Sequence, residues 1–87
     1  MPQSSAEKRD RFSRMFPPRA EKLVDQMRLL ANCSSKSNYE WTEDTVKRAW
    51  IEIAKSLRDT AKVYDLDLTV MLNGDEVQYL DTSKPMF

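Results

Sequence analysis

The stretch that decides the fold lies near the C-terminal end of the chain and reads LDLTVMLNGDEVQY, residues 66–79. Apolar residues alternate along its first half, and Asn73-Gly74 then supplies the residue pair most typical of a two-residue type I′ turn. A turn of this kind sets the register of the two strands. The paired residues are Leu72 with Asp75, Val70 with Val77 and Leu68 with Tyr79. Because this register places the apolar residues of both strands on one face, the sequence predicts a β-hairpin.

Residues 42–64, just before the hairpin, have the pattern of a long amphipathic helix. Thr42 is placed to accept a hydrogen bond from the backbone N–H of Thr45, and acidic residues follow it, as is typical of a helix N-terminus. Seven apolar side chains then share one stripe, namely Val46, Trp50, Ile53, Ala54, Leu57, Ala61 and Tyr64. Since an isolated hairpin is only marginally stable in water, we expect the hairpin to rest on this stripe.

Residues 6–30 predict two short helices separated at Pro17-Pro18. The residue before a proline is disfavoured in the α region, so we expect the first helix to end there. Pro18 then suits the first turn of a second helix, which ends at Leu30. The apolar side of the first helix is Phe12, Met15 and Phe16, and that of the second is Ala20, Leu23, Val24, Met27, Leu30 and Ala31. Ser4 or Ser5 is the expected N-cap of the first helix.

These elements together predict an α+β fold that is mainly helical. It consists of two short N-terminal helices, one long amphipathic helix and a C-terminal β-hairpin, with an Asn/Ser-rich connecting loop over residues 32–40. We expect a disordered lead-in over residues 1–5, a single domain over residues 6–80 and a flexible tail over residues 81–87. At 87 residues the chain can bury only a small core.

The residue types argue against an enzyme. The chain has no histidine, the commonest general base and metal ligand, and a single glycine, so it cannot form a glycine-rich phosphate loop. Cys33 is the only cysteine, which excludes an intrachain disulfide, and we expect it to be a buried structural residue. Two carboxylate pairs, Asp65 with Asp67 and Glu43 with Asp44, are assigned to a helix-to-strand corner and a helix cap. We therefore expect no catalytic residue, no cofactor and no metal.

Charge and hydropathy bear on location and on partners. Fourteen Lys and Arg residues balance fourteen Asp and Glu residues, so no net charge directs the chain to nucleic acid or to an anionic membrane. A polar N-terminal segment, a single cysteine and the absence of a long apolar run predict a soluble cytoplasmic protein.

The N-terminal third offers an alternative function, because it carries an excess of cations. Five of them surround two phenylalanines, Phe12 and Phe16, and are Lys8, Arg9, Arg11, Arg14 and Arg19. Cations among aromatic rings can neutralise phosphates while the rings stack on bases. The opposing interpretation is that the phenylalanines face the core and the cations are solvated. The N-terminal third therefore predicts nucleic-acid binding as an alternative function.

Four apolar or aromatic residues form the candidate partner surface. Leu29 and Ile51 stand among charged residues on their helices, and Tyr39 and Trp41 belong to the residue types most enriched in interface hot spots. The hairpin also has open edges that could pair with a second copy, although short charged edges are equally typical of a monomer. With catalysis excluded, these features predict a non-enzymatic interaction or regulatory protein that self-associates, as a homodimer.

Two short stretches around the connecting loop carry a resemblance. RLLANCS at residues 28–34 and SNYEWTE at residues 37–43 resemble a segment of small uncharacterised bacterial or phage-type accessory proteins. Those chains also run from a helix through an Asn/Ser-rich loop to Tyr-Glu-aromatic-Thr and another helix. The resemblance spans residues 28–43 and leaves out the hairpin. It implies a bacterial or mobile-element origin and no particular activity.

Overall fold

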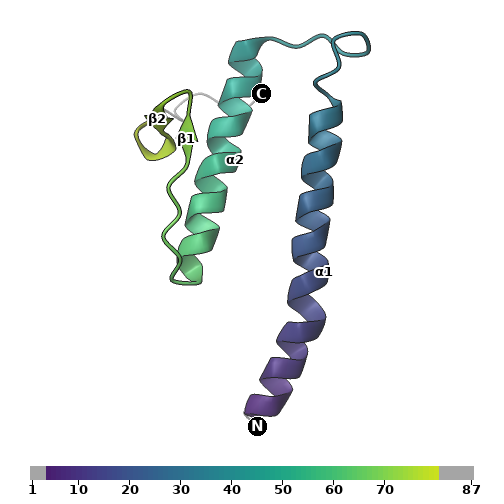
Figure 1. Ribbon diagram of the computed structural model, residues 1–87, viewed down its shortest axis with the longest axis vertical. Helices are drawn as coiled ribbons and strands as arrows, with labels where there is room; N and C mark the ends of the chain where they lie inside the picture. The colour runs from purple at the N-terminus through teal and green to yellow at the C-terminus, as the bar shows by residue number, and fades with distance from the viewer. Residues whose placement is uncertain (1–3, 81–87) are drawn as a thin grey trace. The chain divides into compact units, whose positions relative to one another are not determined.

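The computed structural model describes residues 4–80 of the chain. The elements follow in the order α1, α2, β1, β2 and a 3-10 turn, η1 (Figure 1). They divide into two compact units, one ending at Glu40 and one beginning at Trp41. The sequence predicts a single domain over residues 6–80 instead. The tail predicted for residues 81–87 and most of the predicted lead-in lie outside the described residues.

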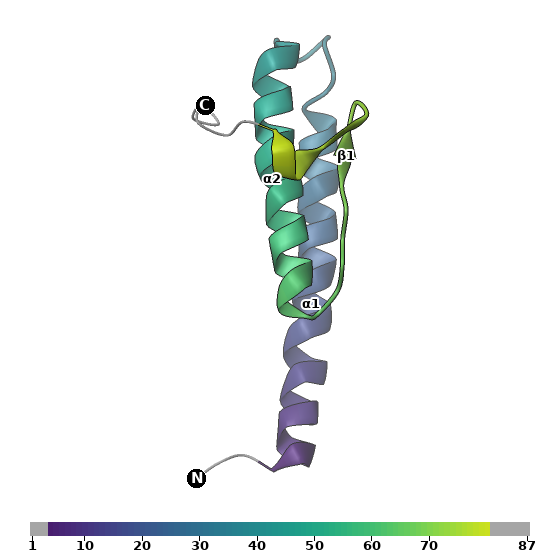
Figure 2. The same cartoon turned by 90° about the vertical axis from the view of Figure 1, so that its left-hand side faces the viewer.

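The first unit contains a single helix, α1 (Ser5–Asn32). Its N-cap is Ser4, as expected, and the Ser4 hydroxyl oxygen accepts a hydrogen bond from the backbone N–H of Glu7 at 3.2 Å. The prediction of two short helices is wrong, because Pro17 and Pro18 both lie inside α1 (Figure 2).

The continuity of α1 has a local physical explanation. A proline in a helix removes its own N–H and its ring crowds the carbonyl four residues earlier, so Pro17 and Pro18 deprive the carbonyls of Ser13 and Arg14 of their intrahelical donors. Ser13 and Arg14 are exposed, so water can take the place of those donors. The restriction on the residue before a proline is a bias against the α region and not a prohibition.

The second unit begins with α2 (Glu43–Val63), and the predicted cap is confirmed. The Thr42 hydroxyl oxygen accepts a hydrogen bond from the backbone N–H of Thr45 at 3.3 Å. At the other end Asp65 adopts a positive φ of 60°. This reversal lets the backbone N–H of Leu66 donate to the carbonyl oxygen of Ala61 at 3.1 Å, which completes a Schellman-type helix end.

The predicted hairpin is present. β1 (Met71–Leu72) and β2 (Asp75–Glu76) pair antiparallel, with Leu72 opposite Asp75 as the turn predicts. Asn73 and Gly74 have φ values of 52° and 91°, and a type I′ turn needs positive φ at both positions. One further bond, from the Val77 N–H to the Val70 carbonyl oxygen at 3.0 Å, follows the same register.

The second arm of the hairpin then leaves the ladder, so the predicted pairing of Leu68 with Tyr79 is wrong. The chain turns into η1 (Val77–Tyr79), which packs on α2. The turn takes Val77 into the core, where its exposed fraction is 1%. Burial of this apolar side chain favours the turn over further strand pairing.

The core of the second unit corrects the predicted face of α2. Its buried side chains are Ile51, Ala54 and Val77. Ile51 was expected among charged residues as part of a partner surface, whereas only 7% of it is exposed. Within the predicted stripe only Ala54 is buried, while Trp50 remains 37% exposed. The chain after α2 therefore packs on a flank of the helix turned away from the centre of the predicted stripe.

Candidate interaction surfaces

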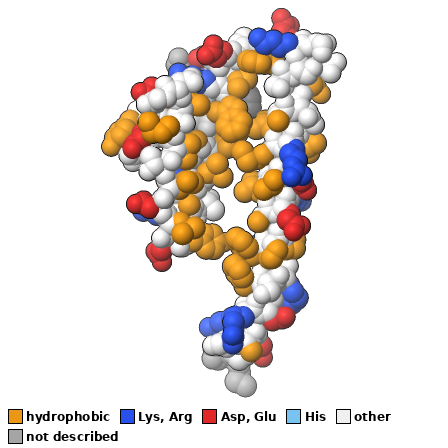
Figure 3. All heavy atoms as spheres, viewed as in Figure 1, with side chains coloured by type: hydrophobic (Ala, Val, Ile, Leu, Met, Phe, Trp, Pro, Cys, Tyr) orange, Lys and Arg blue, Asp and Glu red, His pale blue; other side chains and the backbone are white. Residues whose placement is uncertain are grey.

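The continuity of α1 unites two apolar faces that the sequence assigned to separate helices. Five residues alternate in spacings of four and three along the helix, which places them in one line on its surface. We call them the α1 seam, and they are Phe16, Ala20, Leu23, Met27 and Leu30. Hydrophobic side chains gather along one side of α1 in Figure 3, with charged side chains along the other.

The α1 seam is open to solvent. None of the side chains of α1, all of which the structure describes, is buried. The exposed fractions are 53% for Leu23 and 41% for Leu30, and Ala20 and Met27 are partly exposed. Most helices in proteins are stabilised by packing of their apolar face, and α1 also contains two prolines, each costly in a helix interior. The seam therefore has the character of a contact surface.

The four predicted partner residues do not form one patch. Leu29 is 58% exposed, but it lies about 120° around the α1 axis from Leu23, outside the seam. Tyr39 is 53% exposed in the loop after α1. Trp41 is partly exposed beside the N-cap of α2, and Ile51 is buried. Two of the four thus belong to the first unit and two to the second.

The five predicted nucleic-acid contacts all lie on α1 and are all exposed. The helix distributes them around its axis, so that Arg9 and Arg14 are about 140° apart. The guanidinium of Arg14 forms an ion pair with Asp10 at 3.0 Å. The rings of Phe12 and Phe16 stack on each other, with centroids 4.7 Å apart. The cations therefore do not form the single strip that the sequence suggested.

Cys33 is exposed, which contradicts the expectation that it is a buried residue. Cys33 is the C-cap of α1. No side chain of α1 is buried, so the helix offers no core against which the thiol could pack. The Cys33 thiol lies 3.8 Å from the carbonyl oxygen of Leu29, within the same helix turn.

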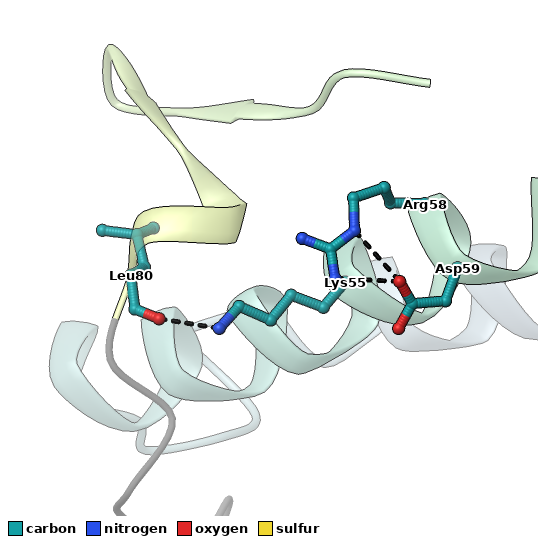
Figure 4. A network of polar contacts seen from close by, with 4 residues as sticks. All are labelled: Lys55, Arg58, Asp59 and Leu80. Atoms are coloured by element: carbon teal, nitrogen blue, oxygen red, sulfur yellow. Dashed lines mark hydrogen bonds and ion pairs between the residues drawn. The ribbon is translucent and has the colours of Figure 1, made fainter. Parts of the chain in front are cut away.

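A groove in the second unit was not anticipated from the sequence. Its volume is about 380 Å³, and it is lined by the C-terminal half of α2, the extended chain before β1 and the start of η1. The lining residues are Arg58, Asp59, Lys62, Leu66–Val70 and Glu76–Gln78. Arg58 donates to the carboxylate of its neighbour Asp59 at 2.8 and 3.0 Å (Figure 4). The first arm of the predicted hairpin, residues 66–72, has seven residues, and the second, residues 75–79, has five. This difference in length is the signal in the sequence that could have predicted the groove.

Residues 4–80 contain no cluster of three or more acidic, cysteine or histidine side chains that could hold a metal ion. Over the same residues, no helix has the length and apolar character needed to span a membrane. In comparisons with known proteins, no family model matched the chain, and no curated protein or solved structure matched it either. The resemblance of residues 28–43 to bacterial or phage-type accessory proteins thus stays a prediction.

Proposed function

We propose that the protein is a non-enzymatic interaction protein that associates with itself through the α1 seam. The observation that supports this proposal is a 28-residue helix with a continuous apolar line and no buried side chain. A second copy of α1 would cover that line and remove Leu23 and Leu30 from water.

The composition of α1 suits contact with another helix. Ala20, near the middle of the α1 seam, is small enough to let a second helix approach closely. The charged side chains of this part of α1 lie off the seam, and Arg28 and Asp25 form an exposed ion pair at 3.1 Å. These charges would stay in water when the seam is covered, so the contact carries no cost for burying unpaired charge.

The test compares Leu23→Asp with Leu29→Asp by sedimentation over a wide range of protein concentration. Leu29 is the matched control, because it is at least as exposed as Leu23 but lies outside the α1 seam. We expect Leu29→Asp to sediment with the same mass as the unaltered chain at each concentration, and Leu23→Asp to sediment with a lower mass, because it loses the contact through the α1 seam. A monomeric unaltered chain, or an equal effect of the two substitutions, would rule out the α1 seam.

Nucleic-acid binding is the second candidate, and the exposure of all five cations on α1 favours it. Contacts with phosphates release counterions, so the affinity should fall as salt rises. The measurement is the anisotropy of labelled single-stranded and duplex DNA at several salt concentrations. Replacing Arg11 and Arg14 with Ala should weaken binding and reduce its salt dependence, whereas absence of binding by the unaltered chain would eliminate this candidate.

A further inference from the structure

The hairpin of the second unit is asymmetric, because one arm is longer than its partner. The ladder ends at the bond between Val77 and Val70, where the second arm turns into η1. The first arm extends back from Val70 to Leu66 as an open trace alongside α2 (Figures 1 and 2). No hydrogen bond joins the backbone of Asp67, Leu68 or Thr69 to any described residue.

The direction of these unpaired backbone groups follows from the register. In an antiparallel ladder the backbone groups of successive residues point alternately toward the partner strand and away from it. Val70 bonds toward the second arm, so the N–H and C=O groups of Thr69 and Asp67 point to the opposite, outer edge. Both residues are exposed, so this outer edge is accessible to another strand.

We propose that Leu66–Val70 pairs antiparallel with the same five residues of a second copy, with the two-fold axis at Leu68. This contact is separate from the α1 seam and does not depend on it. It joins the hairpins of two copies into one continuous sheet through strand addition, in which backbone hydrogen bonds supply most of the contact.

The sequence of this segment is self-complementary in the proposed register. Asp67 of each copy faces Thr69 of the other, and these pairs exchange four backbone hydrogen bonds. Leu68 faces itself, and Leu66 faces Val70, so apolar residues meet on one face of the sheet. The hydroxyl of Thr69 can donate to the carboxylate of Asp67, so no like charges are opposed.

Shifted registers lack this match. An axis at Asp67 would place the two Asp67 carboxylates directly opposite each other, which is destabilising. An axis at Thr69 would place Asp67 opposite Met71, a charge against an exposed apolar side chain. The sequence of the segment therefore favours the register with its two-fold axis at Leu68. That register predicts which residues of the two copies lie close enough to form a disulfide.

The test uses cysteine trapping in the full-length chain carrying Cys33→Ala, which removes the only native thiol. In the proposed register the two Leu68 residues form a non-hydrogen-bonded pair with Cα atoms about 4.5 Å apart. That distance is within the range of a disulfide, about 4.4–6.8 Å. Leu68→Cys should therefore form a disulfide-linked dimer under mild oxidation.

Leu66→Cys is the matched control. It lies on the same strand face and is more exposed than Leu68, 62% against 40%, so random collisions would favour its oxidation. In the proposed register the two Leu66 residues are about 13 Å apart, four residues along the strand, too far for a disulfide. We expect several-fold more disulfide dimer from Leu68→Cys than from Leu66→Cys, and equal yields would overturn the proposal.

A proline substitution provides a second, independent test. Thr69→Pro removes an N–H that makes no intrachain hydrogen bond, so the hairpin itself keeps its ladder, whereas Thr69→Ala keeps the N–H. Added to Leu68→Cys, Thr69→Pro should abolish the trapped dimer and Thr69→Ala should preserve it. Trapping that survives Thr69→Pro would also overturn the proposal. Repeating the trap with Leu23→Asp separates this contact from the α1 seam, because loss of seam association should leave the Leu68 disulfide in place.

Discussion

The Nζ atom of Lys55 in α2 donates a hydrogen bond to the backbone carbonyl oxygen of Leu80, 2.7 Å away and 25 positions along the chain (Figure 4). The bond is partly buried and holds the end of η1 on α2. Lys55→Met keeps most of the apolar side chain and removes the donor, so we expect the free energy of unfolding of the second unit to fall by about 1–2 kcal/mol. Urea unfolding followed by the fluorescence of the two tryptophans, Trp41 and Trp50, measures this. Lys47→Met, at an exposed position of the same helix, should leave stability unchanged.

Val77 is the most completely buried side chain of the described chain. Val77→Ala removes two methyl groups from the core and leaves a cavity, for which we expect a loss of about 2 kcal/mol in unfolding free energy. The same substitution at Val63, which is 81% exposed, serves as the control and should cost nothing. Equal midpoints for the two variants in urea would show that η1 does not stabilise the second unit.

Asp65 occupies the left-handed position at the end of α2, with a φ of 60°. A side chain at such a position costs roughly 1–2 kcal/mol, and glycine adopts it without strain. Asp65→Gly should therefore stabilise the second unit by about 0.5–1 kcal/mol once the greater entropy of glycine in the unfolded chain is subtracted. The readout is the thermal midpoint. Asp67→Gly, at a residue without positive φ, should lower that midpoint, and a gain there would contradict the explanation.

Pro17 leaves the carbonyl of Ser13 without a donor from within α1. Pro17→Ala restores an N–H at that position, and alanine is about 3 kcal/mol more favourable than proline in a helix interior. We expect slower amide hydrogen exchange in the turns of α1 on both sides of residue 17. Arg19→Ala alters the same turn without changing a backbone donor and should leave exchange rates as they are.

Local signals predicted most of the elements. The Thr42 hydroxyl and the Asn73-Gly74 pair act through bonds and φ values only a few residues away, so α2 and the hairpin turn were predictable. The end of the second strand was not, because burial of Val77 against α2 competes with strand pairing and depends on a distant element. Four residues of the α1 seam were predicted as part of one apolar helix face, and only Phe16 was separated from them, because the sequence indicated a break at Pro17-Pro18.

The sequence by itself determined the N-cap of α2, the type of the hairpin turn and its first strand pairs, since each depends on neighbouring residues alone. Only the tertiary structure decided that Ile51 is buried and that the Leu66–Thr69 arm has no partner strand. Those outcomes depend on which flank of α2 receives Val77. That choice buries Ile51, Ala54 and Val77 together, residues from distant parts of the chain, which no local pattern encodes.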